Sequence, residues 1–206
     1  EGASALALRK AVKEGHAQKL AEFMPSYATD ILSNDFKSGR GPVFLEDFTG
    51  AILCRLRAMP LEELARIMDV GEGLEYRIKK AARLSGSVRA LIEGIKSKRY
   101  TESRIRRILL HCLLGITADD ISRIQHAGGP QYIRVLGFSE NGRALLRGIK
   151  KTCPIPVITN FKEYRKYDNP VLKRMIELDS AAADIYVSAY DTPELRRGGE
   201  DFYRKP

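Results

Sequence analysis

Helical periodicity is the sequence feature that most constrains the fold of this chain. Between residues 45 and 126, apolar side chains recur every three or four positions, and short turns divide the pattern into six segments. We expect helices over residues 45–59, 60–69, 72–84, 87–95, 101–114 and 117–126. Pro60 suits a first helical turn, and the acidic residues of "PLEEL" and "TADD" suit helix N-termini, where the helix dipole favours negative charge. The pattern predicts a helical bundle over residues 45–128.

The segments on either side of the bundle have a different character. Residues 3–34 predict short helices broken at Gly15 and Pro25, and "DFKSGRGPVF" predicts a linker. Beyond the bundle, "YIRVLGF" and "PIPVIT" predict short strands on either side of a helix in "SENGRALLRGIKK", which together form a small βαβ unit. A long helix over residues 169–190 and a loop-like tail follow. We therefore expect a mainly α protein in three parts, residues 1–44, 45–128 and 129–206.

Composition indicates a globular protein of the reducing cytoplasm. The chain has 206 residues, 44% of them hydrophobic, and no apolar segment of the roughly 18 residues that a membrane span requires. Cys54, Cys112 and Cys153 are odd in number and lie far apart in apolar surroundings, so we expect three small core residues and no disulfide framework. Because the chain begins Glu-Gly-Ala without a methionine, we also expect it to be a fragment.

No motif of a self-contained active site is present. The sequence has no GxxxxGK[ST], GxGxxG or HxGH motif and no cysteine or histidine pair at metal-ligand spacing. His16 and His126 fall near predicted helix ends without a partner to tune them. The sequence therefore predicts no catalytic residue and no metal ligand within this chain.

Positive charge is concentrated in one region. Of a net charge of +9, residues 71–115 hold eleven Lys or Arg against four Glu. On helical wheels the apolar positions form one stripe and the cations another, so these helices could pack and present charge together. Phosphates require cations and unpaired bases require flat rings to stack on, which favours RNA binding, although a solvated helix face would look alike. The predicted RNA-binding residues are Tyr76, Lys79, Lys80, Arg83, Lys96, Lys98, Arg99, Arg104 and Arg107.

Longer stretches resemble a known family. "SALALRKAV" is similar to the motif that closes the catalytic domain of the HIGH-type nucleotidyltransferase superfamily. "MPLEELARIMDVGEGLEYRIKKAA", "KSKRYTESRIRRILLHCLLGIT", "YIRVLGFSENGRALLRGIKK" and "AADIYVSAY" resemble the C-terminal half of bacterial tRNA(Met) cytidine acetate ligases. The resemblance implies an upstream HxGH-bearing domain that activates acetate with ATP, and we expect Mg²⁺ to assist. The acetyl group of acetyl-adenylate then passes to the wobble cytidine of elongator tRNA(Met), giving N4-acetylcytidine.

The resemblance also assigns roles near the start of the chain. Residues 1–44 would be the end of the nucleotidyltransferase-like domain and its linker, and the helical part after them would help to hold tRNA. Ser4 and Arg9 would contact ATP phosphates, while Leu6 stands where the family motif has Thr or Ser, so one hydroxyl contact is absent. Because the HxGH-bearing part is not in this sequence, we expect the chain alone to be inactive. The alternatives are a nonenzymatic helical RNA-binding module, and a protein-interaction domain that uses apolar patches around "YIRVLGF" and the final helix.

Overall fold

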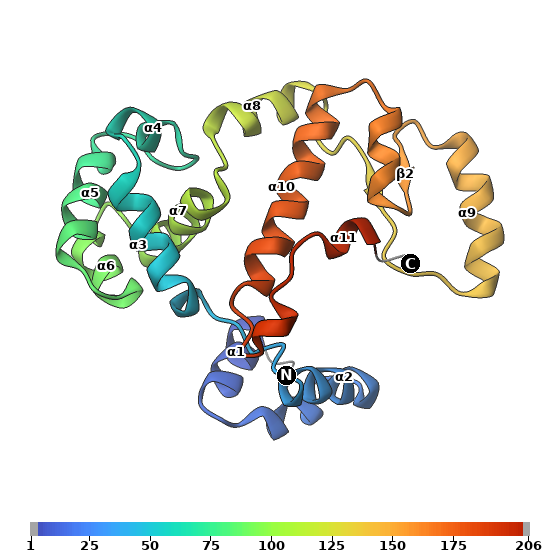
Figure 1. Ribbon diagram of the computed structural model, residues 1–206, viewed down its shortest axis with the longest axis horizontal. Coiled ribbons are helices and arrows are strands. Elements are labelled where there is room, and N and C mark those ends of the chain that lie inside the picture. The colour runs from blue at the N-terminus through green and yellow to red at the C-terminus, as the bar shows by residue number, and fades with distance from the viewer. Residues whose placement is uncertain (1–3, 204–206) are drawn as a thin grey trace.

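The computed structural model describes residues 4–203, and its elements form an arch (Figure 1). A helical bundle lies at one side, a small α/β unit lies at the other, and helices α8 (Ala118–His126) and α10 (Pro170–Val187) run between them. Outside helices, the described residues form one two-stranded parallel sheet and an isolated bridge between Ile67 and Thr117. The expectation of a mainly helical chain with a small βαβ unit is confirmed. The predicted helix start at Ala3 and the last three residues of the tail lie outside the described part.

Three short helices precede the bundle, as predicted. They are α1 (Ala5–Lys13), the 3-10 helix η1 (Ala17–Glu22) and α2 (Ser26–Lys37). Gly15 has φ +79°, a left-handed conformation that glycine adopts without steric cost, and α2 begins directly after Pro25. An ion pair joins this region to the bundle, because Lys13 lies 3.0 Å from Glu46, which in turn lies 3.6 Å from Arg106.

The bundle contains the larger of two hydrophobic cores. Its elements are η2 (Leu45–Phe48), α3 (Thr49–Ala58), α4 (Leu61–Arg66), α5 (Leu74–Leu84), α6 (Val88–Ile95) and α7 (Glu102–Leu114). Leu56, Leu64, Ile78, Leu91 and Ile108 are fully buried in this core, as the apolar periodicity predicts. The Ser87 and Thr101 side chains accept hydrogen bonds from backbone N–H groups and thereby cap α6 and α7. The first predicted helix differs in that it begins as the 3-10 helix η2.

The βαβ unit contributes to a second hydrophobic core. Strand β1 (Ile133–Arg134) pairs in parallel with β2 (Val157–Ile158), and α9 (Glu140–Thr152) connects them. Both strands are only two residues long, shorter than the segments predicted for them. The second core consists of Tyr132, Ile158, Phe161, Leu172 and Ile176.

Helix α10 (Pro170–Val187) contributes to both cores. Leu172 and Ile176 near its start belong to the second core, while Ile185 near its end packs against the bundle. Helix α8 (Ala118–His126) is tied to it by Arg174, which lies 2.8 Å from Asp120. Helix α10 therefore joins the two cores, and the salt bridge holds α8 against it.

Two expectations are corrected by the structure. The tail, predicted as loop, includes η4 (Pro193–Leu195) and α11 (Glu200–Tyr203), because Phe202 packs edge-on against Phe161 with ring centroids 6.0 Å apart. Cys54 is exposed on α3 and is not a core residue, whereas Cys112 is buried and Cys153 is partly buried. Burial raises the pKa of the Cys112 thiol to about 12, so it is an inert core group. Residues 4–203 include no helix long and apolar enough to cross a membrane.

Candidate nucleic-acid interface

The outer face of α5 presents an aromatic ring among cations. Tyr76 is 64% exposed, and Lys80 and Arg83 extend from the same helix with no ion pair to any residue from 4 to 203. Together with Leu61 and Leu84 they line a shallow groove of about 380 Å³. Three of the predicted residues therefore lie together on an accessible surface, which we call the α5 groove.

Lys79 also lines the α5 groove, but its ammonium group does not project outward as predicted. It donates hydrogen bonds to the carbonyl oxygens of Leu56 and Arg57, at 2.8 and 2.9 Å. Those carbonyls belong to the last turn of α3, where no intrahelical donor remains and the helix dipole favours a cation. Lys79 thus caps α3.

The loop after α6 carries Lys96, Lys98 and Arg99, as predicted. Lys98 is exposed and forms no ion pair within the described chain. Arg99 lies 2.5 Å from Glu72, and Lys96 lies 3.7 Å from Glu102. A hydrogen bond from Arg106 to Glu102 lowers the pKa of that carboxyl group, which keeps it ionised and paired. Lys98 is therefore the loop cation with the least intramolecular competition.

The cations of α7 converge on the turn between α4 and α5. Asp69 in this turn has φ +71°, a left-handed conformation that aspartate tolerates better than most residues. Arg104 donates a hydrogen bond to the Asp69 carbonyl oxygen at 2.9 Å, and Arg107 donates one to its carboxylate at 3.4 Å. Arg104 also lies over the buried ring of Tyr100, 5.4 Å from the centroid. The structure gives both arginines a role in packing that the helical wheel did not indicate.

Ser4 and Arg9 lie on α1. Ser4 is the N-cap, and its side chain accepts a hydrogen bond from the Ala7 N–H at 3.2 Å. Arg9 is exposed and has no partner among residues 4–203, and Leu6 is 74% exposed. The structure places this segment on the surface.

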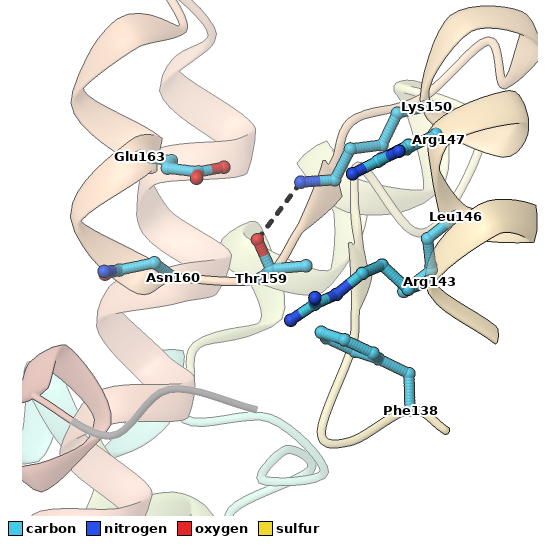
Figure 2. Close-up of a pocket in the computed structure, with 8 residues that line it drawn as sticks. All are labelled: Phe138, Arg143, Leu146, Arg147, Lys150, Thr159, Asn160 and Glu163. Atoms are coloured by element: carbon cyan, nitrogen blue, oxygen red, sulfur yellow. Dashed lines mark hydrogen bonds between the residues drawn. The ribbon is translucent and has the colours of Figure 1, made fainter. Parts of the chain in front are cut away.

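A second basic site, which the sequence analysis missed, lies between α9 and the end of β2. A cavity of about 450 Å³ is lined by Phe138, Arg143, Leu146, Arg147, Lys150, Thr159, Asn160 and Glu163. Figure 2 shows the head groups of Arg143, Arg147 and Lys150 extending from α9 toward Thr159. Lys150 donates a hydrogen bond to the Thr159 hydroxyl at 3.1 Å. We call this the α9 cavity.

A signal for the α9 cavity was present in the sequence. Arg143, Arg147 and Lys150 are spaced four and three residues apart, which places them on one helical face. The net charge of α9 is smaller in total than that of residues 71–115, so a search for the largest excess of positive charge passes over it. Neither arginine forms an ion pair with any residue in the part that the structure describes.

Comparison with known proteins identifies the family. The chain belongs to the HIGH nucleotidyltransferase family, whose model ("HIGH Nucleotidyl Transferase") matches residues 1–201. Its relatives include the tRNA(Met) cytidine acetate ligase of Acetivibrio thermocellus, 40% identical over 97% of this chain and 49% of that protein. The corresponding ligase of Caldanaerobacter subterraneus subsp. tengcongensis is 45% identical over 92% of this chain and 46% of that protein. The resemblance drawn from the sequence is thus confirmed.

Solved structures give the same result for the fold. Thermotoga maritima TmcAL bound with alpha-thio ATP has a TM-score of 0.91 and 34% identity, covering 99% of this chain and 51% of that one. The apo form of the same protein also has a TM-score of 0.91, at 34% identity. The chain spans about half the length of the relatives that it matches.

Proposed function

We propose that this chain is the tRNA-binding part of an ATP-dependent ligase that forms N4-acetylcytidine at the wobble position of elongator tRNA(Met). The supporting observation is its similarity, over nearly its whole length, to tRNA(Met) cytidine acetate ligases. The α5 groove supplies what RNA binding requires, since Lys80 and Arg83 neutralise phosphates and the exposed Tyr76 ring can stack on a base.

The nine proposed RNA-binding residues differ in the intramolecular partners that they already have. Four of them are exposed, have no ion pair with residues 4–203 and can contact RNA directly: Tyr76, Lys80, Arg83 and Lys98. Lys96 and Arg99 must leave carboxylates on the surface, a small cost in solvent. Lys79, Arg104 and Arg107 hold the backbone and the turn on which the free residues stand, and they add positive potential nearby.

Residues 1–44 form, in this proposal, the end of a nucleotidyltransferase-like domain and its linker, followed by a basic bundle over 45–128 and an α/β unit with the long helix over 129–206. Arg9, whose guanidinium group has no partner among residues 4–203, and the Ser4 hydroxyl at the start of α1 would contact phosphates of ATP. ATP use is supported by the alpha-thio ATP in the Thermotoga maritima structure. Acetate would be the second small substrate, and Mg²⁺ would neutralise the phosphates of ATP.

A matched pair of arginines tests the α5 groove. Arg83 lines the groove, while Arg89 is exposed on the neighbouring helix and does not line it. We expect Arg83→Ala to weaken binding of elongator tRNA(Met) several-fold and Arg89→Ala to have a smaller effect, because only the first removes a cation beside Tyr76. Equal losses in a filter-binding titration would show that position on this surface does not matter, and no binding by the unaltered chain would refute the proposal.

A second test concerns the chemistry. Adenylation needs preorganised positive charge around the triphosphate, and Arg9 on α1 cannot supply that alone. We therefore expect no pyrophosphate release when the chain is incubated with ATP, acetate and Mg²⁺. Release above the rate without protein would place an adenylation site within these 206 residues.

A docking role for proteins remains the second candidate. Leu136 is 76% exposed and Leu145 is 67% exposed, so the α/β unit carries apolar surface that a partner protein could cover. Such binding would change little with salt, whereas binding to tRNA should weaken steeply as salt rises.

A further inference from the structure

Helix α9 is packed in an unusual way for a helix that connects two parallel strands. Such a helix normally covers the sheet with its apolar face. None of its residues is buried, and Leu145 and Ile149 are 67% and 45% exposed. The face that lines the cavity instead carries Arg143, Arg147 and Lys150. This side of α9 is therefore not built as core.

The charge in the α9 cavity is unbalanced. Its lining has three cations and one carboxylate, Glu163, and no ion pair joins Glu163 to them. Lys150 is held toward the cavity by the hydroxyl of Thr159, which follows β2 directly. Three cations around a space of about 450 Å³ favour an anion with several acceptor oxygens, such as a phosphate group.

An aromatic ring lies beside these cations. Phe138 is 40% exposed, and the Arg143 guanidinium group lies 6.0 Å from the centre of its ring. Figure 2 shows Phe138 on the same side of the cavity as Arg143. An exposed ring and a guanidinium plane both stack on nucleic-acid bases, and a paired base inside a duplex has no free face to offer. Cations that suit a phosphate and a ring that suits an unpaired base together favour a nucleotide that lies outside a duplex.

We propose that the α9 cavity binds one unpaired nucleotide of an RNA strand. Arg143, Arg147 and Lys150 hold its phosphate, and Phe138 stacks on its base. Glu163 accepts hydrogen bonds but donates none when ionised, so it faces a donor such as the ribose 2′-hydroxyl. The choice of RNA as the ligand rests on the proposed function, while the nucleotide itself is inferred from the cavity.

Single-stranded decauridylate is a suitable probe, because it has little structure of its own. With the full chain, Arg143→Ala combined with Arg147→Ala should weaken its binding on the order of tenfold or more, since both contacts involve charged groups. Phe138→Leu keeps an apolar side chain but removes the flat ring, and should weaken binding on the order of tenfold. The same substitution should leave binding of double-stranded RNA unchanged.

Lys151→Ala is the matched control. Lys151 is exposed on α9 but does not line the cavity, so its loss should change binding less than about twofold. Circular dichroism melts check that each variant is folded. If Lys151→Ala weakens decauridylate binding as much as the double substitution, general charge and not the cavity binds RNA, and the inference is wrong.

Further measurements distinguish a nucleotide site from a general anion site, and the cavity inference from the proposed function. Uridine 5′-monophosphate should displace decauridylate better than inorganic phosphate does, and equal competition would mean that the cavity binds an anion only. If tRNA binds but Phe138→Leu and the double substitution bind decauridylate normally, the cavity inference fails and the proposed function stands. If the chain binds decauridylate through the cavity but does not bind tRNA, the proposed function fails instead.

Discussion

Helices α7 and α9 are both basic, and they use their charge in opposite ways. Arg104 and Arg107 of α7 are engaged by the Asp69 turn, and the helix buries four apolar side chains in the bundle. Arg143 and Arg147 of α9 have no ionic partner among residues 4–203, and the helix buries none of its residues. The difference shows that the cations counted in a sequence are not all available to a ligand, because some already bind groups of the protein.

The cause of the difference lies in what faces each helix. The bundle presents carbonyl groups at helix ends and in turns, and these accept hydrogen bonds from cations such as Lys79 and Arg77. Across from α9 stand only a hydroxyl, an amide and one carboxylate. The packed region uses cations to complete its own hydrogen bonds, and the open region leaves them to solvent or to a ligand.

The largest expected effect compares an apolar residue in each helix. Ile108 on α7 is fully buried, so Ile108→Ala should lower the free energy of unfolding by about 2–5 kcal/mol. Leu145 on α9 is 67% exposed, so Leu145→Ala should change the free energy of unfolding by less than about 0.5 kcal/mol. Urea unfolding of both variants gives the two values. Comparable losses of unfolding free energy would show that Leu145 is packed in solution, and the difference between α7 and α9 would then not hold.

The salt bridge between α8 and α10 should show a pH-dependent contribution. The hydrogen bond from Arg174 lowers the pKa of Asp120 to about 2, from an ordinary value near 3.8. Because the folded state holds the carboxylate ionised, its stabilisation is present above about pH 4 and is lost as pH falls toward 2. Partial solvent exposure reduces its size, so Asp120→Asn should cost about 1–2 kcal/mol at pH 7.

That cost should shrink as the pH falls from 4 toward 2, where the carboxyl group of the unaltered side chain begins to be protonated and lose its charge. Asp119→Asn is the control, because Asp119 is 66% exposed and pairs only with Arg123 one turn along the same helix. It should cost a few tenths of a kcal/mol. Urea unfolding at a series of pH values tests this, and a cost for Asp120→Asn that does not vary with pH would contradict the ionic explanation.

A third comparison, of about the same size, concerns two arginines. Arg104→Ala removes a charged donor from the partly buried Asp69 carbonyl and should cost about 1–2 kcal/mol. Arg147→Ala removes a side chain without an ionic partner in the described chain and should change stability by less than about 0.5 kcal/mol. Thermal melts of the two variants measure this difference in stability, and equal shifts in melting temperature would contradict it.

The sequence predicts the helices correctly, but it does not predict which groups the cationic side chains bind. Apolar periodicity located every helix of the bundle, since burial of Ile78 or Ile108 depends on a local pattern. The partners of Lys79 and Arg104 lie 23 and 35 residues away along the chain, so no local pattern contains them. The tail likewise folds as α11 through contacts with residues far away along the chain, such as Phe161 against Phe202 and Arg134 paired with Asp201. The α9 cavity was missed because its three cations are significant only when they face an unfilled space.

The most direct test of the account is the salt dependence of tRNA binding by two double variants. We predict a steep decrease in affinity with salt for the unaltered chain, and a log-log slope reduced by about 1.4–1.8 in Lys80→Ala with Arg83→Ala, which removes two phosphate contacts. Arg104→Ala with Arg107→Ala, in protein shown to be folded at the assay temperature, should leave the slope nearly unchanged, because those cations already have intramolecular partners. A flat response in the unaltered chain, or equal slope changes in the two variants, would contradict the claim that the unpartnered cations bind tRNA.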